Sequence, residues 1–125
     1  MKVAAKYKTP KGAVKVLLDI IQFEENGVQI VFAPALDLSG YGKTDAEAKE
    51  SFEVTLNEFI RYTVNKGTLF EELIRLGWEV KKRKKVVVAP AMDALLEQND
   101  QLKEIIEQQK SFHKYTQQVR IPAFA

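Results

Sequence analysis

Two runs of β-branched and leucine residues near the start of the chain have the pattern of buried strands. They span residues 14–23 (VKVLLDIIQF) and residues 28–33 (VQIVFA). Asn26 and Gly27 lie between them and give the strongest short signal for a hairpin, because both residue types tolerate a positive φ angle. A shorter run follows at residues 36–41. The pattern therefore predicts a three-stranded antiparallel meander.

A helical period follows the meander. Thr44 and Glu47 have the spacing of a capping box, in which each side chain accepts a hydrogen bond at the helix start. Apolar side chains then recur at steps of three and four, as in a helix with one face against a sheet. These are Ala48, Phe52, Leu56, Phe59, Ile60 and Val64. Gly67 ends the predicted helix, since glycine readily adopts the left-handed backbone of a helix end.

Four further elements are predicted in the remaining sequence. A second short helix spans residues 68–76, and a strand spans residues 78–88 (WEVKKRKKVVV), which Pro90 ends. A third helix is predicted over residues 92–112. The last element, residues 114–124 (KYTQQVRIPAF), has the pattern of a strand that adds to a sheet edge, in its own chain or in a neighbour's.

These elements predict an α+β fold with an antiparallel sheet, formed by the meander and a later strand, and with helices on one face. Three parts follow from the order of elements. Residues 1–13 are a basic N-terminal arm, and residues 14–90 are the α+β domain. Residues 91–125 are a C-terminal helix and strand, which we expect to act as an oligomerisation or partner arm.

The third predicted helix also carries a heptad-like seam. Its positions are Met92, Leu95, Asn99, Leu102 and Ile106, followed by the polar Gln109 and His113. A polar residue in such a seam can fix the register and oligomeric state of a coiled coil. The alternative is that this helix lies on the sheet of its own chain. The seam favours a homodimer or a higher homo-oligomer, and both interpretations stay open.

Composition limits the classes of function. The net charge of +2 in 125 residues is too small to indicate a nucleic-acid-binding protein by itself. There is no cysteine, which excludes a disulfide framework and zinc–thiolate sites. The chain also lacks a signal-peptide pattern and a run of about 20 apolar residues, so we expect a soluble, cytoplasmic protein that spans no membrane.

The acidic residues and the one histidine predict no catalytic site. A two-metal nuclease needs several carboxylates that converge on Mg²⁺, and Asp19, Asp37 and Asp45 do not converge by their positions in the predicted elements. His113 has no serine, cysteine or aspartate at motif spacing. No phosphate-binding or zinc-binding motif is present. We therefore expect a protein without enzymatic activity, metal or cofactor.

One charge cluster stands out. It is the run Lys81, Lys82, Arg83, Lys84 and Lys85. Such a run can contact the phosphates of a nucleic acid. It is also typical of a solvated edge strand, where lysine discourages aggregation between sheets. The run contains no aromatic residue for base stacking, which favours the edge-strand interpretation.

The turn and cap residues form a more specific pattern when taken in order. They are Asn26, Gly27, Pro34, Leu36, Gly42, Thr44, Glu47 and Ala48. In order and spacing the pattern resembles the HicB-like antitoxin domain over about residues 14–65. Each residue also has a role in the fold alone, for example a helix cap or a turn, so the resemblance argues for the fold first.

The resemblance implies a partial ribonuclease-H-like fold without catalysis, which binds and neutralises a small toxin ribonuclease, HicA. Many members also carry a helix-turn-helix or ribbon-helix-helix module that binds DNA. The sequence departs from the family here, because the elements predicted after residue 80 are a strand, one helix and a strand. Whether this chain binds DNA is therefore open.

The leading expectation is a type II antitoxin that neutralises a small basic toxin by covering it. The acidic side chains predicted to bind this partner are Glu47, Glu50, Glu53 and Glu58. The first alternative is a homo-oligomeric structural or regulatory protein without a toxin. The second alternative is a nucleic-acid-binding protein that uses residues 81–85.

Overall fold

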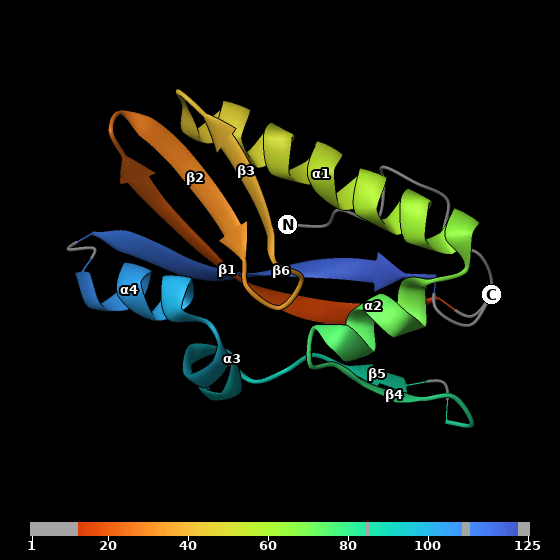
Figure 1. Cartoon of the computed structure of the whole chain (residues 1–125). Helices are drawn as coiled ribbons and strands as arrows, with labels where there is room; N and C mark the ends of the chain where they lie inside the picture. The colour runs from red at the N-terminus through yellow and green to blue at the C-terminus, as the bar shows by residue number, and fades with distance from the viewer. Residues whose placement is uncertain (1–12, 85, 109–110, 123–125) are drawn as a thin grey trace.

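The computed structural model describes residues 13–84, 86–108 and 111–122. Four antiparallel strands form the main sheet in the order β3-β2-β1-β6 (Figure 1). They are β1 (Val14–Glu25), β2 (Val28–Ala33), β3 (Leu38–Gly42) and β6 (Phe112–Ile121). The α+β class and the antiparallel sheet are therefore confirmed. The predicted arm over residues 1–13 lies almost entirely outside the described residues.

The predicted meander is confirmed in its turn and its register. Asn26 and Gly27 have φ angles of 52° and 80°, as a tight hairpin with two left-handed residues requires. β2 pairs with β1 from Glu25↔Val28 to Ile21↔Phe32. The third strand begins at Leu38 rather than at residue 36, because residues 34–37 form the turn that leads into it.

The last strand lies beside the first. β6 pairs with β1 over its whole length, from Phe23↔Phe112 to Val14↔Ile121. The residues of the predicted C-terminal arm thus complete the sheet of their own chain. Side chains from this segment, among them Leu102 and Val119, belong to the same hydrophobic core as those of β1.

Helix α1 (Asp45–Lys66) covers one face of the sheet (Figure 1). Gly40 of β3 faces it so closely that an added Cβ would lie 2.2 Å from the backbone nitrogen of Phe52. The main-chain N–H of Tyr41 also donates a hydrogen bond of 3.1 Å to Ser51 Oγ on the helix. α1 therefore packs against β3 and also protects the edge that this strand presents.

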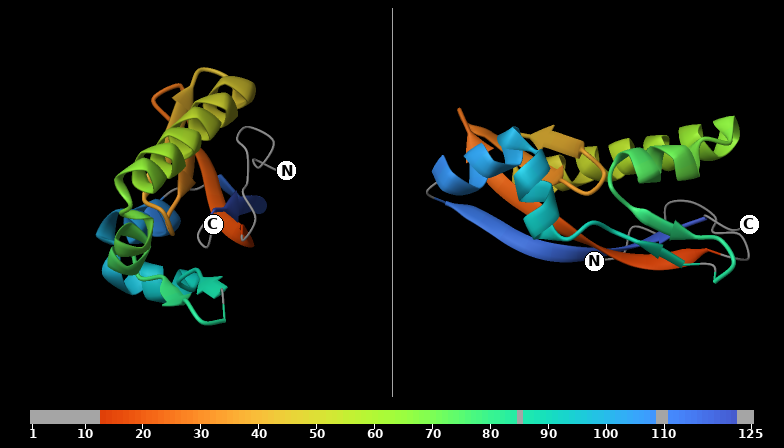
Figure 2. Two further views of the ribbon diagram at one scale, coloured as in Figure 1. Left: turned by 90° about the vertical axis from the view of Figure 1, so that its right-hand side faces the viewer. Right: turned by 60° about the horizontal axis from the view of Figure 1, so that its bottom comes forward.

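The opposite face is covered at one end by α3 (Met92–Gln98) and α4 (Asp100–Gln108), as the two rotated views show (Figure 2). Ile21 pairs with Phe32, and both are buried although their side chains point away from α1. Because buried apolar side chains lie on both faces of β1, other elements of the chain must cover both faces. The helices are thus distributed over both faces of the sheet, whereas the sequence analysis placed them on one.

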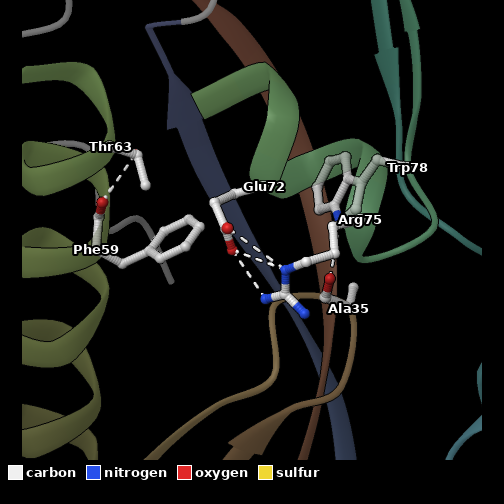
Figure 3. Close-up of polar contacts among 6 residues, drawn as sticks. All are labelled: Ala35, Phe59, Thr63, Glu72, Arg75 and Trp78. Carbon is white, nitrogen blue, oxygen red and sulfur yellow. Dashed lines mark hydrogen bonds and ion pairs between the residues drawn. The ribbon is translucent and has the colours of Figure 1, made fainter. Parts of the chain in front are cut away.

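The capping prediction for α1 is confirmed. Thr44 Oγ1 accepts a hydrogen bond of 3.1 Å from the N–H of Glu47, while Glu47 Oε1 accepts one of 3.0 Å from the N–H of Lys43. Gly67 ends the helix with a φ angle of 70°. The prediction that Val64 belongs to the apolar stripe facing the sheet is wrong, because this residue is 43% exposed. Thr63 is buried instead, and its hydroxyl donates to the carbonyl of Phe59 (Figure 3).

The predicted strand at residues 78–88 is wrong in one respect, because it is a hairpin of two short strands. β4 (Glu79–Lys81) and β5 (Val86–Val88) pair antiparallel, and residues 82–84 form the turn between them. Consecutive cations repel one another and favour exposure, so the run bends away rather than continuing as a strand. Helix α2 (Leu69–Arg75) precedes the hairpin.

The prediction of one helix over residues 92–112 is also wrong. The helix is interrupted at Asn99, whose φ and ψ of −121° and 99° are those of an extended backbone. Its Oδ1 accepts a hydrogen bond of 3.0 Å from the N–H of Leu102, so it caps α4 as asparagine commonly does. His113 lies on β6 opposite Gln22, outside the predicted third helix.

Candidate protein-binding surface

The solvent-facing side of α1 combines acidic and apolar side chains. With about 100° of rotation per residue, Glu47, Glu50 and Glu58 lie on the side of the helix opposite its buried stripe, and all three are exposed. Val54 lies between them along the same face and is 57% exposed. We call these four residues the α1 acidic face. The sequence predicted its three carboxylates but not the apolar side chain among them.

The fourth predicted partner-binding residue lies elsewhere. Glu53 is turned toward the flank of α1, is only partly exposed, and takes part in an interaction within the chain. A carboxylate that is already engaged by its own chain is less available to a partner. The structure therefore brings together three of the four predicted glutamates.

The carboxylates of the α1 acidic face differ in how they are held. Glu58 forms an ion pair with Arg61 on the next turn of the helix. Glu47 is fixed by its hydrogen bond to the N–H of Lys43. Glu50 forms no ion pair with another described residue. Since an exposed ion pair contributes little to stability, a cationic partner can compete with Arg61 at small cost.

A polar cluster joins the start of α1 to β1 and β6. Gln22 of β1, which is 6% exposed, donates a hydrogen bond from Nε2 to Asp45 Oδ1. Lys49 Nζ lies 3.1 Å from Asp45 Oδ2 and 5.6 Å from the centre of the Tyr115 ring. The hydrogen bond from Gln22, and next that from Lys49, hold the pKa of Asp45 below its usual value. Burial raises the pKa of Tyr115.

This cluster positions α1 on the sheet, and sequence reasoning did not find it. The available signal was Gln22, a polar residue that lies between the apolar Ile21 and Phe23. Among the described residues, no three histidine, cysteine or acidic side chains lie close enough together to hold a metal ion. Asp45 lies at the start of α1. Asp19 lies on β1, and Asp37 lies in the turn before β3 with a φ of 54°.

The basic run is divided by the hairpin. Lys81 ends β4, and its Nζ lies 3.5 Å from Glu79 Oε1. Lys82, Arg83 and Lys84 occupy the exposed turn. Lys85 lies outside the described residues.

The predicted oligomer seam is also divided. Met92 and Leu95 lie on α3, Asn99 lies at the break, and Leu102 and Ile106 lie on α4. Leu95 is 7% exposed and Leu102 is fully buried, so both are used by the core of their own chain. A seam on one continuous helix is therefore not formed.

None of the helices in the described part of the chain is long and apolar enough to cross a membrane. Comparison with known protein families, with curated proteins and with solved structures finds no match. The resemblance to HicB-like antitoxins thus depends on the sequence pattern alone.

Proposed function

We propose that this chain is a non-catalytic, cytoplasmic binding protein that covers a small basic ribonuclease, in the manner of the type II antitoxins that it resembles. The observation that carries the proposal is the α1 acidic face. Carboxylates at Glu47, Glu50 and Glu58 surround the exposed Val54 on a well-anchored helix. An interface of this kind combines charge complementarity with an apolar contact near its centre.

The proposed mechanism is occlusion. A ribonuclease must present cations to its RNA, and an acidic helix that binds those cations excludes the RNA from them. α1 has 22 residues, so at 1.5 Å per residue it is about 33 Å long, enough to span the RNA-binding surface of a small protein. The opposite charges also accelerate the encounter of the two proteins, because electrostatic steering raises association rates.

The first test is an affinity pull-down of the tagged chain from its own cells, followed by mass spectrometry. We expect a small basic protein at near-equal stoichiometry, and we expect that protein to cleave RNA when it is separated from the chain. Adding the chain back should stop the cleavage at a ratio of about one to one. A captured partner with no ribonuclease activity would overturn the antitoxin proposal.

The second test changes the surface. Glu50→Lys with Glu58→Lys should slow association about tenfold or more at low salt, and should weaken inhibition of the partner. The control is Glu104→Lys with Glu107→Lys, which reverses two exposed charges on α4. Both variants have the same net charge. Equal slowing in both would show that the α1 acidic face is not the docking site.

A homo-oligomer is the second candidate, and β6 favours it. This ten-residue strand pairs with β1 on one side and is the last strand of the described sheet on the other. Such an edge can pair with the same strand of a second copy. Sedimentation equilibrium of the pure chain measures this directly. If the chain is a monomer at all concentrations and a ribonuclease is captured, the homo-oligomer is excluded and the antitoxin proposal is supported.

A further inference from the structure

Residues 82–84 of the basic run lie at the end of a projecting hairpin, apart from the α1 acidic face. β4 and β5 are paired as a two-stranded ribbon of their own, separate from the main sheet. In Figure 1 this ribbon lies at the lower right, with its turn at the end that is farther from α3. Lys82, Arg83 and Lys84 therefore stand together at an accessible tip, where all three are exposed.

The charges at this tip are not neutralised by the chain. Lys81 is paired with Glu79, but Arg83 and Lys84 form no ion pair with a described carboxylate. Lys82 Nζ lies 5.2 Å from the centre of the Phe70 ring, and this cation–π contact restrains the side chain without removing its charge. Three adjacent positive charges thus remain available to an anion.

The valines fix the hairpin to the body. Val87 of β5 is 6% exposed and belongs to the hydrophobic core. Val80 of β4 is its cross-strand partner and packs against the same core. Trp78, just before β4, is held by a hydrogen bond to Ala35. The tip is therefore presented on a rigid base, which lowers the entropy lost when it binds.

We propose that the Lys82–Lys84 tip binds the phosphate backbone of a nucleic acid. A two-stranded ribbon has the dimensions to approach a duplex groove, and three cations at its end can contact successive phosphates. The described turn carries no aromatic side chain for stacking and no asparagine or glutamine to read a base edge. The binding is therefore independent of base sequence and strongly dependent on salt. It does not depend on the antitoxin proposal.

The test measures fluorescence anisotropy of the full chain with a labelled 20-base-pair DNA duplex and with a single-stranded RNA of the same sequence, from 50 to 200 mM NaCl. Three neutralised phosphates give a slope of log K against log salt of about −2.7 for the duplex. The affinity should thus fall about 40-fold over this range. For the single strand the expected slope is about −2. The arm with the higher affinity identifies the kind of nucleic acid.

The site is tested by replacing Lys82, Arg83 and Lys84 with alanine, which should remove the salt-dependent binding. Arg83→Ala alone should reduce the slope by about 0.9, and this milder variant guards against a folding defect in the triple one. The control removes the same number of charges elsewhere. Its substitutions are Lys43→Ala, Lys103→Ala and Lys114→Ala, all at exposed positions.

Three results would overturn the proposal. The first is no binding to either nucleic acid at 50 mM NaCl. The second is an equal loss of binding in the tip variant and in the control, which would assign the binding to overall charge. The third is a tip variant that binds nucleic acid as strongly as the unchanged chain does. If this variant also aggregates, the cations serve to protect the strand edge.

Discussion

The indole N–H of Trp78 donates a hydrogen bond of 2.7 Å to the main-chain carbonyl of Ala35 (Figure 3). The two residues are 43 positions apart, and both are buried. The bond joins the segment between α2 and β4 to the turn between β2 and β3. It thus fixes the projecting hairpin, whose core contacts begin at this tryptophan, to the main sheet.

We expect Trp78→Phe to lower the free energy of unfolding by about 1–3 kcal/mol, because the buried carbonyl of Ala35 loses its donor. Urea unfolding followed by far-ultraviolet circular dichroism measures the change. Tyr62→Phe is the control, since Tyr62 is 62% exposed and its change should stay within about 0.5 kcal/mol. Equal midpoints for both variants would contradict the assigned role.

Gly40→Ala should destabilise the fold by about 3 kcal/mol, at the upper end of overpacking effects. The new methyl group would meet backbone atoms of α1 at 2.2–2.6 Å, and backbone cannot move aside as a side chain can. Gly27→Ala is the comparison, because Gly27 has open space around it and a φ of 80°. That variant should cost about 1 kcal/mol of backbone strain. A Gly40→Ala variant as stable as Gly27→Ala would disprove the close packing.

Asp45→Asn should change the pH dependence of stability. The folded state holds the pKa of Asp45 below the unfolded value of about 3.9, so the carboxylate stabilises the fold above that pH. This contribution is lost as the pH falls through the folded pKa. The stability difference between Asp45 and the asparagine variant should therefore be greater at pH 6 than at pH 2. Urea titrations at several pH values measure it.

Gln22→Met provides a second variant for the same measurement. It removes the hydrogen bond that contributes most to the shift while keeping the carboxylate of Asp45. Its stability should depend less on pH between 2 and 5 than that of the unchanged chain. Parallel curves for all three proteins would show that the Gln22–Asp45 contact carries no linkage to protonation.

Asn99→Ala should cost about 1 kcal/mol, the usual effect of losing a helix cap. Asn99→Asp keeps an acceptor for the N–H of Leu102 and should stay close to the unchanged chain. Neither variant should gain helical signal in circular dichroism. A gain would mean that the cap alone breaks the helix, and that the burial of Leu95 and Leu102 does not.

Elements that depend on neighbouring residues could be predicted from the sequence. The Asn26–Gly27 hairpin and the Thr44 cap are set by φ preferences and by local hydrogen bonds, and both are confirmed. The break at Asn99 was missed because the helical period of the apolar residues continues through it. The apolar spacing of α3 and α4 therefore resembles that of one helix. Tertiary packing of the two short helices decided between these alternatives.

The candidate surface was predicted only in part. The carboxylates of Glu47, Glu50 and Glu58 follow from helical spacing, which is a local property. The contact of Gln22 with Asp45 depends on how α1 crosses the sheet, and no local pattern contains that information. The hairpin tip was missed for a similar reason, because the run at residues 81–85 is compatible with an edge strand and with a turn.

The pairing of β6 with β1 has a consequence for biosynthesis. β1 emerges from the ribosome long before β6, because its partner along residues 14–23 is not made until residues 112–121 are synthesised. Until then Leu18 and Ile20 have an unfinished sheet beside them. Such a nascent strand is open to chaperones and to wrong pairing. A premature stop before residue 112 should thus yield a product that cells degrade rather than a smaller working domain.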